Sequence, residues 1–416
     1  MMENNGFAVQ AQRFPAMFTQ LFPLMGIWLH LSLKSVMLLY SVGFIIFYFT
    51  CFFLILRVAK QPTLAFIFLL YSILMVRHSF FWIQCEFVQG VAFTLVYFAF
   101  LEKRIQQGSL QMLHFIVYGL LLIVVIFYYP SLIFLSSFIF LLFSIQYKKR
   151  IIPLMILFAI NLLFFWIKTT LITNYYDDQQ IGLAINFKAY QWNILNFKST
   201  QDFITYVQHH YYPVLILFLI GIVWLMYQKK YLHLFLVCFY ILGYLFIIFN
   251  KSPNGYKQFY IESQYLLISV FVASMFIYSN RQIPRLQNIF SILIFSFVLL
   301  SLLRIIYLSQ KYTARNNYIR QLVHNNPDKT ILEDSEINSE ILLMNWGLSY
   351  EVWLLTTLES GSTKSLYNKE AHEDLSDRNK CTTCWIHKFA FAEYKNLNKR
   401  YFKFIDSVNA YQYKTK

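Results

Sequence analysis

Three ionisable side chains, Arg77, His78 and Glu86, lie within ten residues of one another, between two apolar stretches of the chain. A carboxylate at the edge of an apolar helix could act as a general base or as a metal ligand in a partly dry site. It could also form an ion pair with Arg77 and His78 that closes a helix hairpin. Because helix ends commonly carry charge, the pattern slightly favours the ion pair and leaves the catalytic interpretation open.

The adjacent carboxylates Asp177 and Asp178, in the sequence NYYDDQQ, form a second candidate site. Two carboxylates together can chelate a hard cation such as Mg²⁺, which prefers oxygen ligands. Adjacent acids are also common at solvated helix starts, where they favour the positive end of the helix dipole. The solvated start is the favoured interpretation, and a divalent ion, Mg²⁺ or Mn²⁺, remains a candidate cofactor.

Aromatic and basic residues in two further polar segments could contact a substrate. Trp192 and His209 lie in one segment, and Lys257 lies in the turn-rich sequence NKSPNGYKQFYIES. Aromatic faces beside imidazoles suit a sugar ring or a phosphate headgroup, and a lysine can hold a phosphate as a point charge. The alternatives are the ordinary aromatic belt at a membrane interface and a solvated loop.

The sequence CTTCWIH contains Cys381 and Cys384 beside a single histidine. This set falls short of the four ligands of a closed zinc site, so we expect a local disulfide if the segment lies outside the cytoplasm. The chain has 12 glycines and no glycine-rich phosphate loop. The sequence therefore argues against nucleotide binding by a P-loop or a Rossmann unit.

The composition indicates which elements must position these residues. Hydrophobic residues make up 58% of the 416 positions and charged residues 13%, against roughly 25% charged in soluble domains. Such a chain cannot cover itself with polar surface, which predicts an all-α polytopic membrane protein. A span needs about 20 mostly apolar residues. We predict ten spans, over 35–56, 61–76, 87–101, 110–128, 130–146, 151–170, 212–227, 231–249, 264–279 and 287–307.

Lysine and arginine are concentrated in alternate connections between these spans, which predicts that those connections are cytoplasmic. The net charge of +15 then reflects topology rather than nucleic-acid binding. The outer loop 171–211 and a tail module, 308–416, face outward across a bacterial-type inner membrane. The tail is long enough for a small folded module, helical or mixed α/β.

Residues 1–34 are apolar but contain Pro15 and Pro23, which predicts one or two outward-facing interfacial helices. Because a chain that starts outside commonly follows an inward-to-outward helix, we expect such a helix upstream of Met1. In the alternative, 14–33 itself crosses the membrane and reverses every loop. In the favoured interpretation, the transmembrane domain spans 35–307.

The opening GFAVQAQRFPAMFTQLFPL, the many spans, the outward acidic loop and the outward tail together resemble polytopic glycosyltransferases of the GT-C superfamily. The resemblance implies transfer of a sugar from a polyprenyl-phosphate donor in the membrane to a glycan, lipid or protein acceptor on the outer face. It implies an acidic base, Glu86 or Glu3, of which Glu3 lies in the stretch matching the family's first outer loop. Arg77, His78 and Lys257 would face the lipid phosphate.

Three other classes fit the layout less well. A transporter would normally show ionisable residues in mid-span and inverted repeats, which are not evident here. A surface-polysaccharide polymerase usually has a larger central loop than 171–211. A membrane assembly protein without chemistry would use mainly its tail.

Overall fold

The computed structural model describes most of the chain. The described residues are 1–2, 5–9, 11–81, 85–108, 111–175, 177–178, 182, 190–256, 258–280, 287–343, 345, 347–369, 382–387, 390–404 and 410–413. The predicted site residues Glu3 and Lys257, and the cysteine Cys381, lie outside this set.

The chain folds into two compact units. The first, which we call the helical unit, contains Val9–Phe18 and Phe44–Ile305. The second, the tail unit, contains Met1–Ala8, Thr19–Gly43 and Ile306–Lys416. Residues 19–43 were not expected to belong with the tail, because no sequence feature connects the two segments.

The helical unit is built from helices alone in its described residues. It contains the short helix η1, parts of α2 and α13, and the helices between them. Their bounds are η1 Phe14–Ala16, α2 Leu33–Phe53, η2 Leu54–Val58, α3 Pro62–Leu74, η3 Ser79–Phe81, α4 Glu86–Gln106, α5 Met112–Tyr128, α6 Leu132–Gln146, η4 Lys148–Arg150, α7 Ile151–Thr170, η6 Ile194–Asn196, α9 Lys198–His209, α10 Tyr212–Tyr227, α11 Tyr231–Lys251, α12 Gln258–Asn280 and α13 Gln287–Asn325.

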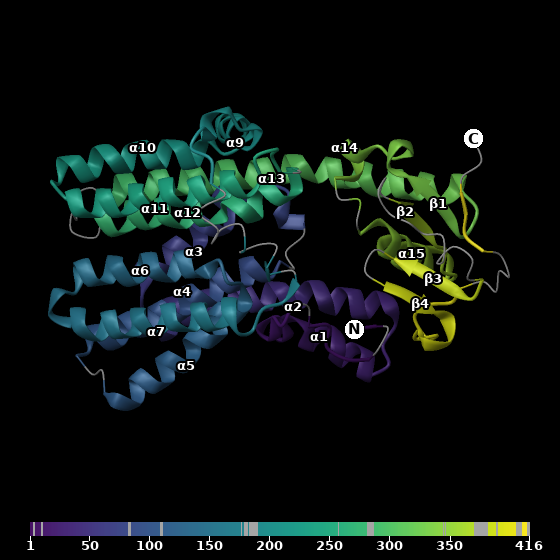
Figure 1. Cartoon of the computed structure of the whole chain (residues 1–416), viewed down its shortest axis with the longest axis horizontal. Helices are drawn as coiled ribbons and strands as arrows, with labels where there is room; N and C mark the ends of the chain where they lie inside the picture. The colour runs from purple at the N-terminus through teal and green to yellow at the C-terminus, as the bar shows by residue number, and fades with distance from the viewer. Residues whose placement is uncertain are drawn as a thin grey trace. The chain divides into compact units, whose positions relative to one another are not determined.

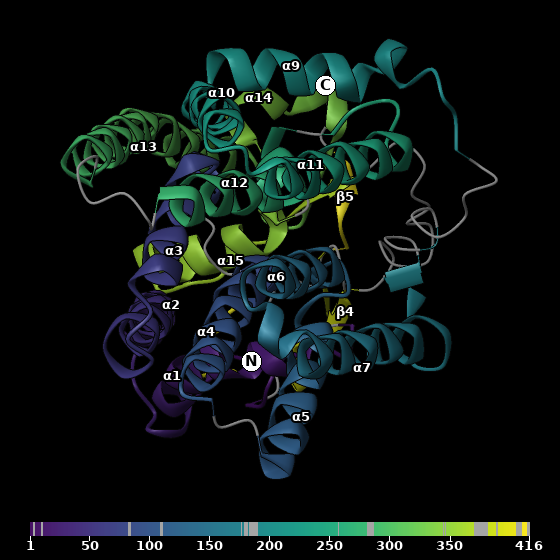
Figure 2. The same cartoon turned by 90° about the vertical axis from the view of Figure 1, so that its left-hand side faces the viewer.

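Two groups of long helices run side by side in this unit. Figures 1 and 2 show α4, α5, α6 and α7 in one group and α10, α11 and α12 in the other. Helix α6 joins the two groups through contacts with both α7 and α11. Most of its side chains are buried, and the rings of Phe138 and Phe271 pack at a tilt, with centroids 4.8 Å apart.

Each of the ten predicted spans coincides with one of these helices. In the described residues, four helical stretches are long and apolar enough to cross a membrane, namely Leu33–Val58, Lys148–Thr170, Tyr231–Lys251 and Ser291–Asn325. Helices α9 and α10 form a further apolar pair, bent by 88°. Exposed side chains such as Met112, Ile152 and Phe235 leave apolar surface uncovered. These findings support a membrane protein, and the count of ten crossings stays a prediction.

Prolines account for several of the helix boundaries. Pro62 begins α3, and the predicted break at Pro130 lies between the end of α5 and the start of α6. By contrast, α13 has no proline or glycine and continues to Asn325. The predicted boundary at 307/308 therefore falls inside a continuous helix, although the contacts change units at Ile305 and Ile306.

The tail unit is mixed α/β. Strands β2 (Leu366–Lys369), β1 (Thr330–Glu333) and β5 (Gln412–Tyr413) form a parallel sheet in that order. Strands β3 (Cys384–His387) and β4 (Ala390–Glu393) form an antiparallel pair, and α14 (Ser339–Leu342) and α15 (Leu348–Ser360) complete the unit. Cys384 is disulfide-bonded, and its expected partner is outside the described residues.

An aromatic core holds the tail unit together. Trp353 of α15 is fully buried against Phe402 and Phe404, at centroid distances of 5.7 and 5.1 Å. Leu24 of α1 (Met17–Trp28) and Val36 of α2 belong to the same cluster. The N-terminal helix thus buries one face in the tail unit, which supplies core that the tail sequence alone lacks.

Candidate functional site

A buried polar cluster in the helical unit brings together residues from four segments. We call it the Asp177 cluster, and its members are Arg13, Glu86, Lys168, Asn174 and Asp177. Asp177 accepts from Arg13 Nη2 at 3.2 Å and from Asn174 Nδ2 at 2.7 Å, and it pairs with Lys168 Nζ at 3.0 Å. Arg13 Nη1 also lies 3.6 Å from Glu86 Oε2.

Local structure explains how each member reaches the cluster. Glu86 is the first residue of α4, where the helix dipole favours an acid, and Lys168 is in the last turn of α7, where it favours a cation. Arg13 immediately precedes η1, and its guanidinium lies 4.3 Å from the ring centroid of Tyr129. The segment after α7 places Asp177 beside both Arg13 and Lys168.

The four charges of the cluster balance, as buried charges require. The side chains of Arg13, Lys168 and Asp177 are at most 6% exposed, whereas that of Glu86 is 28% exposed. Both oxygens of Asp177 are occupied by close donors. Glu86 has one long ionic contact among the described residues, so it is the acid in this cluster that a substrate hydroxyl could reach.

A second buried acid, Glu262 of α12, forms what we call the Glu262 cluster. Its carboxylate accepts from the backbone amides of Arg77, His78 and Ser79 at 2.7–2.8 Å. The hydroxyls of Ser79 and Tyr211 add bonds of 2.6 and 2.5 Å. Five donors saturate this carboxylate, so its function is to fix the turn after α3.

Arg304 of α13 supports the same turn from the other side. Its Nη2 donates to the carbonyls of Ile73, Leu74 and Val76 at 3.0–3.2 Å, and its Nη1 donates to the carbonyl of His210. These carbonyls lie at the ends of α3 and α9 and have no helical partners there. One guanidinium therefore caps two helices.

The predicted ion pair between Glu86 and Arg77 or His78 is not present. In the described part of the chain, the cation beside Glu86 is Arg13, and the peptide groups of Arg77 and His78 bind Glu262 instead. The prediction considered only neighbours in sequence. Arg77 is 8% exposed, and its Nη1 atom has no hydrogen-bond partner among the described residues.

Asp177 and Asp178 are adjacent in the sequence but differ in burial. Asp177 is buried between two cations, which contradicts the favoured solvated start for this residue, whereas Asp178 is exposed. Arg13 and Lys168 contact the two carboxylate oxygens of Asp177, which are the atoms that a metal would bind. No group of three or more histidine, cysteine or acidic side chains gathers in the portion of the chain that the structure describes.

The other predicted contact residues that the structure describes, Trp192 and His209, form none of the bonds described above. Trp192 is 85% exposed and rests against Phe246 of α11 at 5.3 Å between ring centroids. His209 is the exposed last residue of α9, and its ring lies 6.5 Å from that of His210.

Sequence reasoning missed four residues, namely Arg13, Lys168, Glu262 and Arg304. Each is a lone ionisable residue in or beside an apolar segment, which is a signal for a buried partner. The signal does not identify the partner. The partners are identified by the contacts described above. No family model, curated protein or solved structure matches this chain.

Proposed function

We propose that this protein is a membrane transferase of the glycosyltransferase type, which moves a sugar from a polyprenyl-phosphate donor to an acceptor hydroxyl on the outer face. The observation that supports the proposal is the exposure of Glu86 within an otherwise buried, charge-balanced cluster. A carboxylate held in this way by a fixed cation is positioned to accept a proton from a substrate.

In the proposed reaction, Glu86 takes the proton of the acceptor hydroxyl as its oxygen attacks the anomeric carbon. The bond from that carbon to the phosphate oxygen breaks, and the electron pair leaves on the lipid phosphate. Arg13 orients Glu86 from 3.6 Å. Arg77, with a buried and unpaired Nη1 among the described residues, is the proposed donor to the leaving phosphate.

A divalent ion at Asp177 and Asp178 has no step in this scheme. Asp177 is already neutralised by Arg13 and Lys168, and Asp178 is exposed beside it. Asp177 instead positions Arg13, which in turn positions Glu86.

The test uses the full-length protein in proteoliposomes with a panel of tritiated polyprenyl-phosphate hexoses and pentoses and a cell-envelope extract of glycans, lipids and proteins as the acceptor. It measures loss of label from the donor lipid. Wild-type protein should consume at least one donor. Glu86→Gln should lower turnover about 100- to 10,000-fold, since it removes the base. Asp178→Asn is the matched control and should keep full turnover.

Two results would contradict the proposal. If the wild-type protein consumed no donor in the panel, the glycosyltransferase assignment would fail and a membrane assembly protein would be the better interpretation. If Glu86→Gln turned over at the wild-type rate, the transferase would stand and Glu86 would lose its assigned step.

A further inference from the structure

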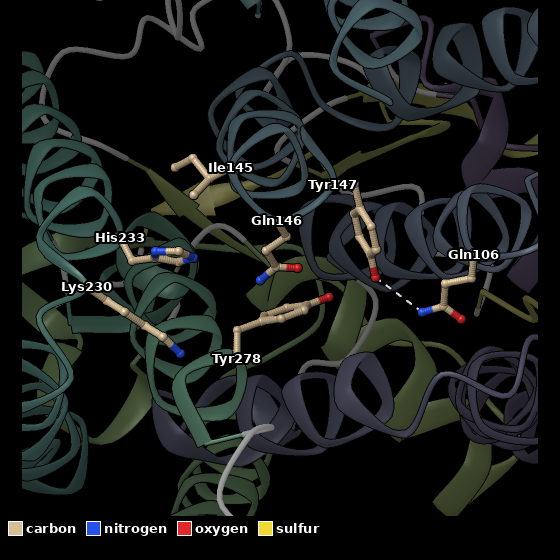
Figure 3. Close-up of a pocket in the computed structure, with 7 residues that line it drawn as sticks. All are labelled: Gln106, Ile145, Gln146, Tyr147, Lys230, His233 and Tyr278. Carbon is tan, nitrogen blue, oxygen red and sulfur yellow. Dashed lines mark hydrogen bonds between the residues drawn. The ribbon is translucent and has the colours of Figure 1, made fainter. Parts of the chain in front are cut away.

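The cavity in Figure 3, of about 540 Å³, lies in the helical unit, and several of the groups that line it already bond within the protein. Gln106 Nε2 donates to the hydroxyl of Tyr147 at 3.2 Å, as the dashed line marks. The hydroxyls of Tyr147 and Tyr278 donate to the buried carboxylate of Glu102, at 2.6 and 3.4 Å. These contacts join α4 to the end of α6 and to α12, so Gln106 and the two tyrosines have a structural role.

A second cavity, of about 460 Å³, lies entirely within the tail unit, and we call it the Trp28 cavity. Its volume is in the range of small-molecule sites, roughly 300–1,000 Å³. Three segments form it, namely the N-terminal residues, the end of α1 and the segment 398–401. Its polar and aromatic lining consists of Asn5, Trp28, His30, Asn398, Arg400 and Tyr401.

The end of α1 places two of these side chains beside the cavity. His30 has a left-handed backbone, with φ of +58°, at a position that glycine usually occupies. The turn is closed by bonds from the Leu31 amide to the Gly26 carbonyl at 2.9 Å and from the His30 amide to the Ile27 carbonyl at 3.0 Å. Arg400 Nη2 donates to the His30 carbonyl. A non-glycine residue held in this conformation is a feature that recurs at ligand sites.

The other lining residues are fixed by bonds to one another. Asn398 Nδ2 donates to Asn5 Oδ1 at 2.8 Å, and the Arg400 amide donates to Asn398 Oδ1 at 3.1 Å. These bonds leave donors over. Among the described residues, the Nδ2 atom of Asn5 and the imidazole of His30 have no hydrogen-bond partner, and they are available to a ligand.

Trp28 provides an aromatic surface at this cavity. Its Nε1 atom donates to the Asn5 carbonyl at 3.4 Å, which orients the ring, and the side chain is 55% exposed. In the part of the chain that the structure describes, no other ring stacks on it. The C–H face of a sugar can pack on such a ring while its hydroxyls bond to nearby amides. A membrane-interface role would explain the exposed tryptophan but not the amides beside it.

The charge of the lining favours an acidic sugar over a neutral one. Arg400 is exposed, and its guanidinium has donors beyond the one that bonds to His30. The lining contains no acidic side chain among the described residues. A guanidinium binds a carboxylate through two parallel bonds, which a neutral sugar cannot accept in the same way.

We propose that the Trp28 cavity binds a uronic acid residue of an anionic glycan. Trp28 supplies the stacking surface, Asn5 bonds to the sugar hydroxyls, and Arg400 bonds to the carboxylate. Residues 1–34 and the tail are both predicted to face outward, where a cell-envelope glycan would be. The proposal is independent of the proposed sugar transfer, because binding at this cavity requires no step at Glu86.

The test is isothermal titration calorimetry of the full-length protein in phosphatidylcholine nanodiscs. The probes are tetrasaccharides of galacturonate, glucuronate and mannuronate, each paired with its carboxyl-reduced form. At least one acidic probe should bind about tenfold more tightly than its reduced form, since the reduced form loses the contact with Arg400. No preference for any acidic probe would overturn the proposal.

Variants locate the binding. Arg400→Gln should remove the preference for the acidic probe, whereas Lys399→Gln, the same change at the exposed neighbouring position, should keep it. Trp28→Ala should weaken binding of both forms about tenfold or more, whereas Leu29→Ala removes an exposed apolar side chain beside it and should have no effect.

The variants also distinguish the proposal from its alternatives. Equal effects of Trp28→Ala and Leu29→Ala would assign Trp28 to the membrane interface and overturn its role in the cavity. Equal effects of Arg400→Gln and Lys399→Gln would show nonspecific attraction of an anion to a basic surface, which also overturns the proposal. If Arg400→Gln does not fold, Asn5→Ala provides a second variant, and it should weaken binding of both the acidic and the reduced probe.

Discussion

The Asp177 cluster and the Glu262 cluster solve the same problem by different means. Each buries an acid in an apolar bundle, where an unpaired charge is costly. Asp177 is neutralised by two side-chain cations, Arg13 and Lys168. Glu262 is stabilised mainly by neutral donors, three of which are backbone amides.

This difference in donors distinguishes the Asp177 cluster, a candidate catalytic site, from the Glu262 cluster, which is structural. Backbone amides cannot move without distorting the chain, so Glu262 holds one turn in one geometry. Side-chain ion pairs are adjustable, and the Asp177 cluster extends through Arg13 to the partly exposed Glu86. A carboxylate with spare acceptor capacity is what a general base requires.

The largest effect is expected for Glu262→Gln. The amide keeps one acceptor oxygen but turns donor hydrogens toward the surrounding donors, so several bonds are lost in a buried place. We expect the free energy of unfolding to fall by about 3–5 kcal/mol. Denaturant unfolding in mixed micelles measures it, with Asp178→Asn as the exposed control. A loss no larger than that of the control would show that the turn does not depend on this carboxylate.

A smaller loss is expected for Asp177→Asn. The substitution leaves Lys168 without its carboxylate, whereas Arg13 keeps Glu86 as a partner. The unfolding free energy should fall by about 2–3 kcal/mol. Asp178→Asn should change it by less than about 0.5 kcal/mol, since that side chain is exposed. Equal effects of the two neighbouring substitutions would contradict the buried position of Asp177.

Glu86→Gln should change stability by less than about 1 kcal/mol, because its single ion pair is long and partly solvated. The same unfolding experiment measures it. Little change in stability together with a large loss of turnover would separate a catalytic role from a structural one. A stability loss matching that of Asp177→Asn would place Glu86 among the structural groups.

In the tail unit, the acid Glu351 is expected to make stability depend on pH. Burial raises the pKa of Glu351 above its usual value, and Arg315, 2.5 Å away, opposes this only in part. The folded tail therefore binds a proton more tightly than the unfolded chain. Its stability should be greatest below pH 4.5 with respect to this group and should fall as pH rises through the raised pKa.

Hydrogen exchange of peptides from α15 in the full-length protein measures this pH dependence. Glu351→Gln should flatten it, whereas Glu359→Gln should not, because Glu359 forms an exposed pair with Arg320. Retention of the full dependence in Glu351→Gln would assign it to other groups in the tail.

The helices could be predicted from the sequence because the length of an apolar stretch is a local property. The ten predicted ranges and the break at Pro130 coincide with helices and a helix end. Strands β1 and β2 are only four residues long and pair in parallel across the helices α14 and α15, so no local alternation marks them.

The site could be predicted only in part, since its contacts are distant in the chain. Glu86 was identified as a candidate acid from its position, but its cation, Arg13, comes from the N-terminal segment. Glu262 meets Arg77 across 185 positions, and it does so through a peptide group. Matching opposite charges along a sequence cannot find a partner that contributes only its backbone.

The stretch from Arg77 to Glu86 begins at the Glu262 cluster and ends at the Asp177 cluster. Its first three amides are bound to Glu262, and its last residue pairs with Arg13. The number of residues between these two anchors therefore acts as a fixed spacer that sets where Glu86 stands. A gain or loss of one residue between the two anchors would shift the carboxylate relative to its cation.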